Sequence, residues 1–133
     1  MPVSYADASR VIQAAHAQAL ALGVRITVAI VDEGAHIVAL GRMDGAMPLS
    51  PKIAEGKAVG AALLARDGAA IAQMAQDRPA FFSAISSMNK GPIVPGTGSL
   101  LIKKDGVIVG AIGISGAKPE QDLECAEAAL NAI

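Results

Sequence analysis

The sequence predicts an α+β fold, in which helices flank an antiparallel sheet of five strands or fewer. Residues 25–31 and 36–43 are two β-branched runs separated by a short turn, and residues 100–103 and 107–114 flank a second turn. Both turns contain Asp and Gly, which is typical of a β-hairpin. Helical spacing of apolar residues before, between and after the hairpins gives the order α-β-β-α-(α)-β-β-α.

Capping residues predict where the helices begin and end. Ser4 is typical of a helix start, and Gly23 is typical of a helix end. Ser50 suits the N-cap of a second helix, with Pro51 at its first position. Residues 69–75 suggest a short third helix, residues 79–88 an irregular or helical piece, and residues 89–99 a loop. Pro119 begins a last helix, with an inward stripe of Leu123, Ala126, Leu130 and Ile133.

The strand of residues 25–31 is apolar on both faces, with Ile26, Val28 and Ile30 on one side and Ala29 and Val31 on the other. Burial on both sides indicates a sheet that is covered twice. We expect the helices to pack mostly on one face and another subunit to cover part of the second face. The alternative, in which the helices divide between the two faces, stays open.

The composition predicts one domain over residues 1–133, with a core of Ala, Val, Ile and Leu. Hydrophobic residues make up 53%, aromatic residues 2%, and the net charge is -1. The lack of a basic run argues against nucleic-acid binding. The sequence has one cysteine, Cys125, and a single cysteine excludes an internal disulfide and a CxxC metal site. We expect Cys125 to lie in the core. No signal-peptide pattern or membrane-spanning run is evident, so we expect a cytoplasmic protein.

Three segments carry a resemblance to a known family. They are residues 28–40 (VAIVDEGAHIVAL), residues 42–46 (RMDGA) with the helix that follows, and residues 105–116 (DGVIVGAIGISG) with the helix that follows. In this order and spacing, the chain resembles the GlcG/HbpS-like family, also called the haem-degrading or PduO C-terminal-like domain. The sequence departs from the family's pattern at residues 94–100, which read VPGTGSL in place of a Gly-Gly-Gly-Pro-like run.

The resemblance implies a profilin-like fold and a homo-oligomer, with sizes from tetramer to octamer. It also implies an accessory role beside a catabolic or cofactor pathway, because members of the family have been linked to haem, to glycolate use and to corrinoids. Haem is therefore a cofactor that the resemblance alone suggests, and the residues themselves name none.

The end of the second strand is one candidate site. His36 and Arg42 lie on the same side of that strand, and Asp44 follows in the next loop. Lys57 lies on the next helix, so Arg42 and Lys57 could form an anion-binding pocket. In the alternative interpretation, Arg42 and Asp44 form an ion pair that anchors the loop and Lys57 is solvated.

The corner between the last strand and the last helix is a second candidate. Ser115 and Gly116 precede a helix N-terminus, where a carboxylate or phosphate could bind. Glu120 and Asp122 could instead satisfy that first turn. The small residues of a nearby loop, Gly96, Thr97 and Gly98, add a candidate binding segment that lacks the pattern of a nucleotide-binding P-loop.

Two functions fit these residues. The first is an oligomeric accessory protein that binds a small organic anion or a haem- or corrinoid-type ligand. His36 is then a candidate ligand, Met43 and Met47 are others, and His16 is expected at or near the surface. The second is an isomerase, lyase or hydratase, in which Arg42 and Lys57 orient a carboxylate. The group that moves a proton is then one of Asp44, His36, Glu120 and Asp122. No metal site is predicted, because two His residues this far apart lack ligand spacing.

Overall fold

A computed structural model describes residues 2–133, which form five helices and four strands. The elements follow the predicted order, and the additional piece after the third helix is itself helical. In chain order they are α1 (Tyr5–Leu22), β1 (Thr27–Asp32), β2 (Ile37–Arg42), α2 (Ser50–Leu64), α3 (Gly68–Asp77), α4 (Pro79–Ser86), β3 (Ser99–Lys104), β4 (Val107–Ser115) and α5 (Pro119–Leu130).

The four strands form one antiparallel sheet in the order β2-β1-β4-β3. Each hairpin places its two strands side by side, and β1 joins the hairpins by pairing with β4. Thr27 of β1 lies opposite Arg42 of β2 on one side and Ser115 of β4 on the other. The ends of three strands therefore meet at one edge of the molecule, which is where the sequence places several candidate residues.

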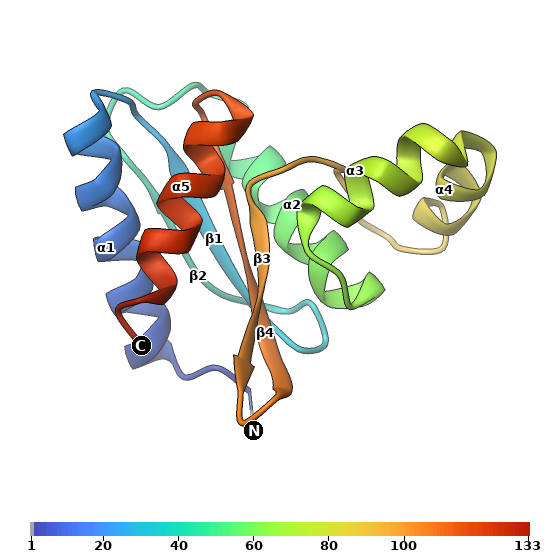
Figure 1. The fold of residues 1–133 in the computed structure, drawn as a ribbon, viewed down its shortest axis with the longest axis horizontal. Helices are drawn as coiled ribbons and strands as arrows, with labels where there is room; N and C mark the ends of the chain where they lie inside the picture. Colours follow the sequence, from blue (N-terminus) through green and yellow to red (C-terminus); the bar gives the residue numbers. More distant parts are fainter. Residues whose placement is uncertain (1) are drawn as a thin grey trace.

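Helices cover both faces of the sheet, as Figure 1 shows, with α1 and α5 on one side and α2 on the other. The expectation that the helices pack mostly on one face is therefore wrong. Val28 and Ile30 of β1 face α1 and α5, while Ala29 and Val31 face α2, and all four are fully buried within a single chain. Because one chain buries both faces of β1, this burial gives no support to a second subunit.

Helix α2 lies directly on the backbone of β4. A Cβ atom at Gly113 would stand 2.2 Å from the carbonyl oxygen of Ala54 and 2.6 Å from the amide nitrogen of Ala58. In α2 and α5, the smaller residues face the sheet, including Ala54, Ala58, Cys125 and Ala129. Larger side chains would hold the layers further apart, so the low aromatic content of the sequence reflects this close packing.

The inward stripe predicted for the last helix is only partly correct. Ala126 is buried as predicted, and Cys125 is a core residue, but Leu123 and Leu130 are half-buried. Ile133 is 42% exposed and lies beyond the end of α5. The stripe was misjudged because the helix packs through small residues, which carry a weak periodic signal.

The predicted caps of α1 are confirmed. The Ser4 hydroxyl accepts a hydrogen bond from the Asp7 amide at 3.0 Å, and Gly23 ends the helix with φ 74°. The cap predicted for α2 is wrong, since the N-cap is Leu49. Ser50 is buried instead, where its hydroxyl donates to the Met47 carbonyl at 2.6 Å and lies 2.8 Å from the Thr27 hydroxyl.

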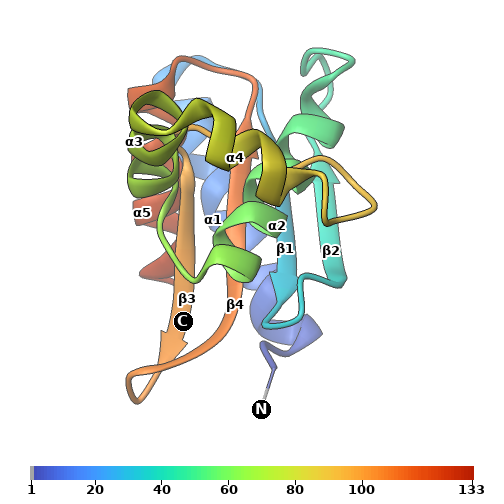
Figure 2. The same cartoon turned by 90° about the vertical axis from the view of Figure 1, so that its right-hand side faces the viewer.

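In Figure 1, helices α3 and α4 extend away from the sheet as an arm, and Figure 2 views the molecule from the side of this arm, with α3 and α4 in front of the strands. Ile71 of α3 is nevertheless a core residue. No residue of α4 is buried, although the helix is rich in apolar residues. The arm starts and ends at nearly the same place, because a Cβ at Gly68 would stand 2.1 Å from the Gly96 carbonyl oxygen. The loop after α4 then returns along α2, where the Val94 amide donates to the Gly56 carbonyl at 3.1 Å.

We expect the substitution Gly113→Ala to destabilise the fold by about 1–3 kcal/mol or more, because its methyl group would overlap the backbone of α2. Gly91→Ala is a matched control, since the nearest atom to its Cβ position is the Asn89 side chain at 3.9 Å. Urea denaturation of both variants measures the two costs. Equal stability of the two variants would contradict the close contact between α2 and β4.

Candidate functional site

Lys57 is buried, with 7% of its surface exposed, and its ammonium group binds three oxygen atoms of the chain. It donates to the Ile114 carbonyl at 2.8 Å, to the Thr97 carbonyl at 3.2 Å and to the Asp122 carboxylate at 3.3 Å. An ammonium group has three N–H donors, so these partners use all of them. The interpretation of Lys57 as a solvated residue is therefore wrong.

Asp122 is the charged partner in this cluster, and 2% of its surface is exposed. Its second carboxylate oxygen accepts a hydrogen bond from the Ala117 amide at 3.1 Å. Burial raises the pKa of Asp122 to about 6, although the charge of Lys57 and the hydrogen bonds work in the opposite direction. We call these four residues, Lys57, Thr97, Ile114 and Asp122, the Lys57 junction.

The glycines predicted as a binding segment pack against the Lys57 junction. Gly98 has φ 112°, and a Cβ there would stand 2.8 Å from the Cβ of Asp122 and 3.3 Å from the Lys57 Nζ. A Cβ at Gly96 would contact the Lys57 side chain at 3.3 Å. The loop thus encloses the ion pair tightly, which accounts for its small residues without a ligand.

The corner after β4 is also closely packed. A Cβ at Gly116 would stand 2.5 Å from the Arg25 carbonyl oxygen, so this glycine lets two backbones meet. Ser115 is buried, Asp122 satisfies the amide of Ala117, and Glu120 is exposed in the first turn of α5. Of the two acidic residues expected to accept hydrogen bonds from free amides at the start of this helix, Asp122 does so.

Arg42 and Asp44 lie at a different place, in a depression of about 520 Å³ between α1 and the end of β2. Arg42 donates to the Ala46 carbonyl at 2.7 Å, and no Arg42–Asp44 ion pair forms within residues 2–133. Lys57 is not among the residues that line this depression, so the structure does not bring Arg42 and Lys57 together. We call this space the α1–β2 depression. It is lined by His16, Leu20, Arg25, Arg42, Met43 and Asp44.

His16 and Arg25 also line this depression, although neither is among the site residues predicted from the sequence. The register of the first hairpin brings the residues before β1 beside those after β2, since Thr27 lies opposite Arg42 and the Met43 amide donates to the Ile26 carbonyl at 3.0 Å. Arg25 lies next in this direction. His16 required knowledge of how α1 packs on β2. A Cβ at Gly41 would stand 3.1 Å from the His16 ring, so the missing side chain makes room for the imidazole.

The imidazole of His16 is held in one orientation and is half-buried. Its Nε2 lies 3.0 Å from the Gly41 carbonyl oxygen, and because a carbonyl only accepts, Nε2 carries the hydrogen. The lone pair of the neutral ring is then on Nδ1. A histidine whose other nitrogen donates to a carbonyl is a common arrangement among metal ligands.

His36 lies at the opposite end of β2, next to the hairpin turn, and its side chain is 82% exposed. Its Nδ1 lies 3.2 Å from the Asp32 carboxylate, which also accepts hydrogen bonds from the amides of Gly34 and His36. Partial burial would raise the pKa of Asp32, but these hydrogen bonds and the charge of His36 lower it overall. The structure separates His36 from Arg42 and Asp44 by the length of the strand.

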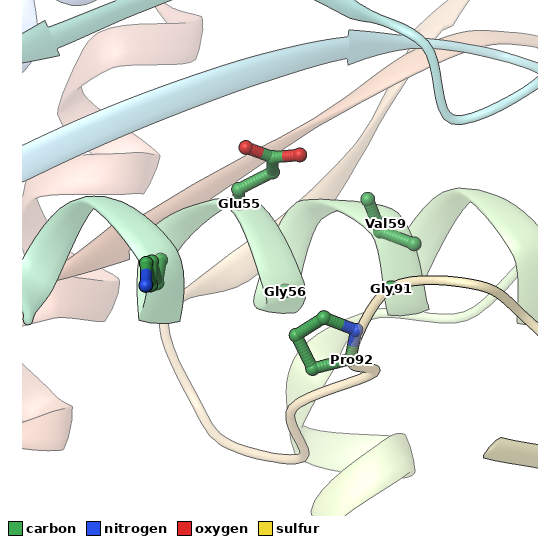
Figure 3. A pocket seen from close by; sticks show the side chains of 6 residues that line it. Glu55, Gly56, Val59, Gly91 and Pro92 are labelled. Atoms are coloured by element: carbon green, nitrogen blue, oxygen red, sulfur yellow. The ribbon is translucent and has the colours of Figure 1, made fainter. Parts of the chain in front are cut away.

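A cleft of about 440 Å³ lies on the outer side of α2, under the loop that returns from the arm. Figure 3 shows Glu55 and Val59 on one side of the helix, with Gly91 and Pro92 on the loop that passes beside Gly56. Lys52 completes the lining. These residues share no pattern in the sequence, because they become neighbours only when the loop folds onto the helix.

Two properties of residues 2–133 concern membrane-spanning helices and clusters of metal ligands. None of the described helices has the length and hydropathy needed to cross a bilayer. Within the same part of the chain, no three His, Cys, Asp or Glu side chains gather in a way that could hold a metal ion.

The fold and these sites can be compared with known proteins. A family model described as haem degrading protein HbpS-like matches residues 3–131. The chain therefore belongs to the HbpS-like family, as the sequence resemblance indicated. An uncharacterized 15.0 kDa protein of the dhaT–dhaS intergenic region of Citrobacter freundii is 32% identical over 129 residues, which cover 97% of this chain and 90% of that protein.

Two relatives carry specific protein names. GlcG of Escherichia coli K12 is 34% identical over 112 residues, covering 81% of this chain and 77% of GlcG. The corrinoid adenosyltransferase PduO of Salmonella typhimurium is 30% identical over 131 residues, which are 98% of this chain but only 39% of PduO. The chain thus corresponds to one part of PduO.

Solved structures agree with this assignment. A PduOC–haem complex matches with a TM-score of 0.89 and 29% identity, covering 100% of this chain and 96% of that one. The Klebsiella pneumoniae protein ORFY matches with a TM-score of 0.88 and 27% identity, covering 98% of this chain and 89% of ORFY. HbpS itself, at 24% identity and a TM-score of 0.87, shows the same fold.

Replacing Lys57 with Met should destabilise the protein by about 3–5 kcal/mol, because Asp122 would remain buried without its cation. The double variant Lys57→Met with Asp122→Leu should recover much of this loss, since neither charge then remains. Lys104→Met, which removes an exposed lysine paired with Asp7, should cost much less. Denaturant unfolding of the three variants measures these differences, and similar costs for the two lysines would contradict the prediction.

The raised pKa of Asp122 should make the stability depend on pH. The pKa of Asp122 in the folded protein, about 6, lies above the ordinary value of 3.8, so the folded state binds this proton more tightly than the unfolded state does. The contribution of the protonated Asp122 to the free energy of unfolding is therefore complete below pH 3.8 and is lost as the pH rises through about 6. Asp122→Asn cannot ionise and should lose less stability between about pH 4 and about pH 7. Unfolding free energies measured across this range test the difference, and parallel curves would refute it.

Proposed function

We propose that this protein is an accessory binding protein that holds a carboxylate-bearing small ligand of the haem type in the α1–β2 depression. The observation that carries the proposal is the gathering of His16, Arg25 and Arg42 around one open space of about 520 Å³. Guanidinium groups bind carboxylates through paired hydrogen bonds, and an imidazole is the usual axial ligand of haem iron.

The chemistry of this depression fits a tetrapyrrole better than the surroundings of His36 do. Leu20 and Met43 add apolar surface beside the imidazole and the two arginines. His36 is highly exposed, and its neighbours are the acidic Asp32 and Glu33, which would repel propionate groups. The Met43 sulfur already accepts from the Ile26 amide at 3.4 Å, so His16 is the better iron ligand of the two.

The relatives support the class of ligand without naming it for this chain. A PduOC structure contains haem, and another relative, PduO, is a corrinoid adenosyltransferase. We therefore place the protein in a catabolic or cofactor pathway, with a smaller organic acid as the other ligand that two arginines would accept. Bound haem would supply an iron centre, while this chain would supply the nitrogen of His16 and the cations of Arg25 and Arg42.

Self-association and a cytoplasmic location are part of the same proposal. Helix α4 exposes apolar side chains, among them Phe81 at 42%, and Met88 just beyond it is 82% exposed. Exposed apolar surface of this kind is typical of subunit contacts. The single cysteine, Cys125, is buried and unpaired, which suits a reducing compartment. Sedimentation of the purified protein would give the oligomer size, from tetramer to octamer.

An enzyme in which Arg42 and Lys57 orient one substrate is a weaker hypothesis. The three N–H groups of Lys57 already bind protein oxygens, so this residue has no donor left for a substrate. Arg42 and Asp44 remain accessible, but together they provide only one cation and one carboxylate. The binding function therefore has the stronger support.

We expect haem titrated into the protein to give a shifted Soret band, and His16→Ala to weaken this binding by about tenfold or more. Arg42→Ala should weaken it about three- to tenfold, because one carboxylate contact is lost. Absorbance titration gives the dissociation constants.

The second histidine of the chain provides the control for this experiment. His36→Ala should leave the Soret band and the affinity unchanged, because His36 lies at the other end of β2. If His36→Ala abolishes the band while His16→Ala does not, the ligand binds at the hairpin instead. If neither variant changes the titration, the proposed axial ligand is wrong.

A further inference from the structure

The cleft outside α2 is separate from the α1–β2 depression and shares no lining residue with it. Its volume of about 440 Å³ falls within the range of about 300–1,000 Å³ that is typical of small-molecule sites. Val59 and Pro92 provide apolar walls, Gly91 is exposed, Gly56 is buried beneath the loop, and the two remaining lining residues are charged.

The loop wall of this cleft is fixed to the helix. The Val94 amide donates to the Gly56 carbonyl at 3.1 Å, and a Cβ at Gly56 would stand 2.5 Å from the Val94 side chain. A Cβ at Gly60 would stand 2.8 Å from Ile93, which is buried. Two glycines one helical turn apart therefore let the loop lie directly on α2, and this contact sets the width of the cleft.

The charged residues of the cleft are Lys52 and Glu55, three positions apart on α2. Residues at this spacing are neighbours on one face of a helix. Both are exposed, and neither forms an ion pair among residues 2–133. The cleft thus offers one positive and one negative group, about one helical turn apart, beside an apolar wall.

We propose that this cleft binds an α-amino acid with a large apolar side chain. The ligand's carboxylate would pair with Lys52, its ammonium group with Glu55, and its side chain would lie against Val59 and Pro92. A simple organic acid would satisfy only Lys52, and a simple amine only Glu55. A free α-amino acid carries both charges on groups bonded to one carbon atom and therefore matches this pair, as opposite charges arranged in complementary positions give specificity.

The test is an NMR titration of the isotope-labelled 133-residue chain with L-phenylalanine at millimolar concentrations. Shifts are expected at the amides of Gly56, Val59 and Gly91. N-acetyl-L-phenylalanine lacks the ammonium group and L-phenylalanine amide lacks the carboxylate, so each should bind about tenfold more weakly.

Variants of the two charged residues make the test specific. Glu55→Gln should weaken phenylalanine binding about tenfold but leave the N-acetyl compound unchanged, because that compound has no charge for Glu55 to pair with. Lys52→Gln should show the corresponding pattern with the amide. Lys103→Gln and Glu127→Gln, which remove exposed charges outside the cleft, should change nothing.

The outcomes separate this proposal from the haem-type function. His16→Ala should leave phenylalanine binding intact, even if it abolishes haem binding. Absence of shifts at the cleft, or equal binding of all three compounds, would overturn the proposal. It would also be overturned if the shifts followed protein concentration rather than phenylalanine, since a second copy of the chain would then occupy the cleft.

Discussion

The ammonium group of Lys57 joins four parts of the molecule that are far apart in the sequence. It extends from α2 and binds oxygens of the loop before β3, of the end of β4 and of α5. A buried charge is tolerated only where its partners are close and well placed. The end of β4, the corner into α5 and the loop before β3 therefore depend on one another.

Local chemistry explains why much of the fold could be predicted. The two Asp- and Gly-containing turns predicted the hairpins, and Ser4 and Gly23 predicted the limits of α1, because these residues act through their immediate neighbours. The distribution of helices over the sheet was mispredicted for a different reason. Ala54, Ala58 and Ala126 pack against strands, but alanine occurs on any helix face and gives little directional signal.

The candidate site was harder to predict, because its residues meet only through tertiary packing. Arg42 and Asp44 were recognised from their place at a strand end, and they do line one depression. Lys57 was misjudged because a lysine on a helix is normally solvated, and only the folded chain reveals its oxygen partners. His16 lacked a local signal, since its importance depends on a glycine in a strand 25 positions later.

The arm of α3 and α4 has a consequence for how this chain can change in length. Gly68 and Gly96 lie almost in contact, so the residues between them leave the body and return to the same point. Ile71 of α3 and Ile93 of the returning loop belong to the core, but α4 between them buries no residue. The α4 part of the segment can therefore lengthen, shorten or be exchanged while the order of the strands and the packing of α1 and α5 stay the same. The body and the arm can therefore vary at different rates, with new binding surfaces arising on the arm while the sheet beneath it is kept.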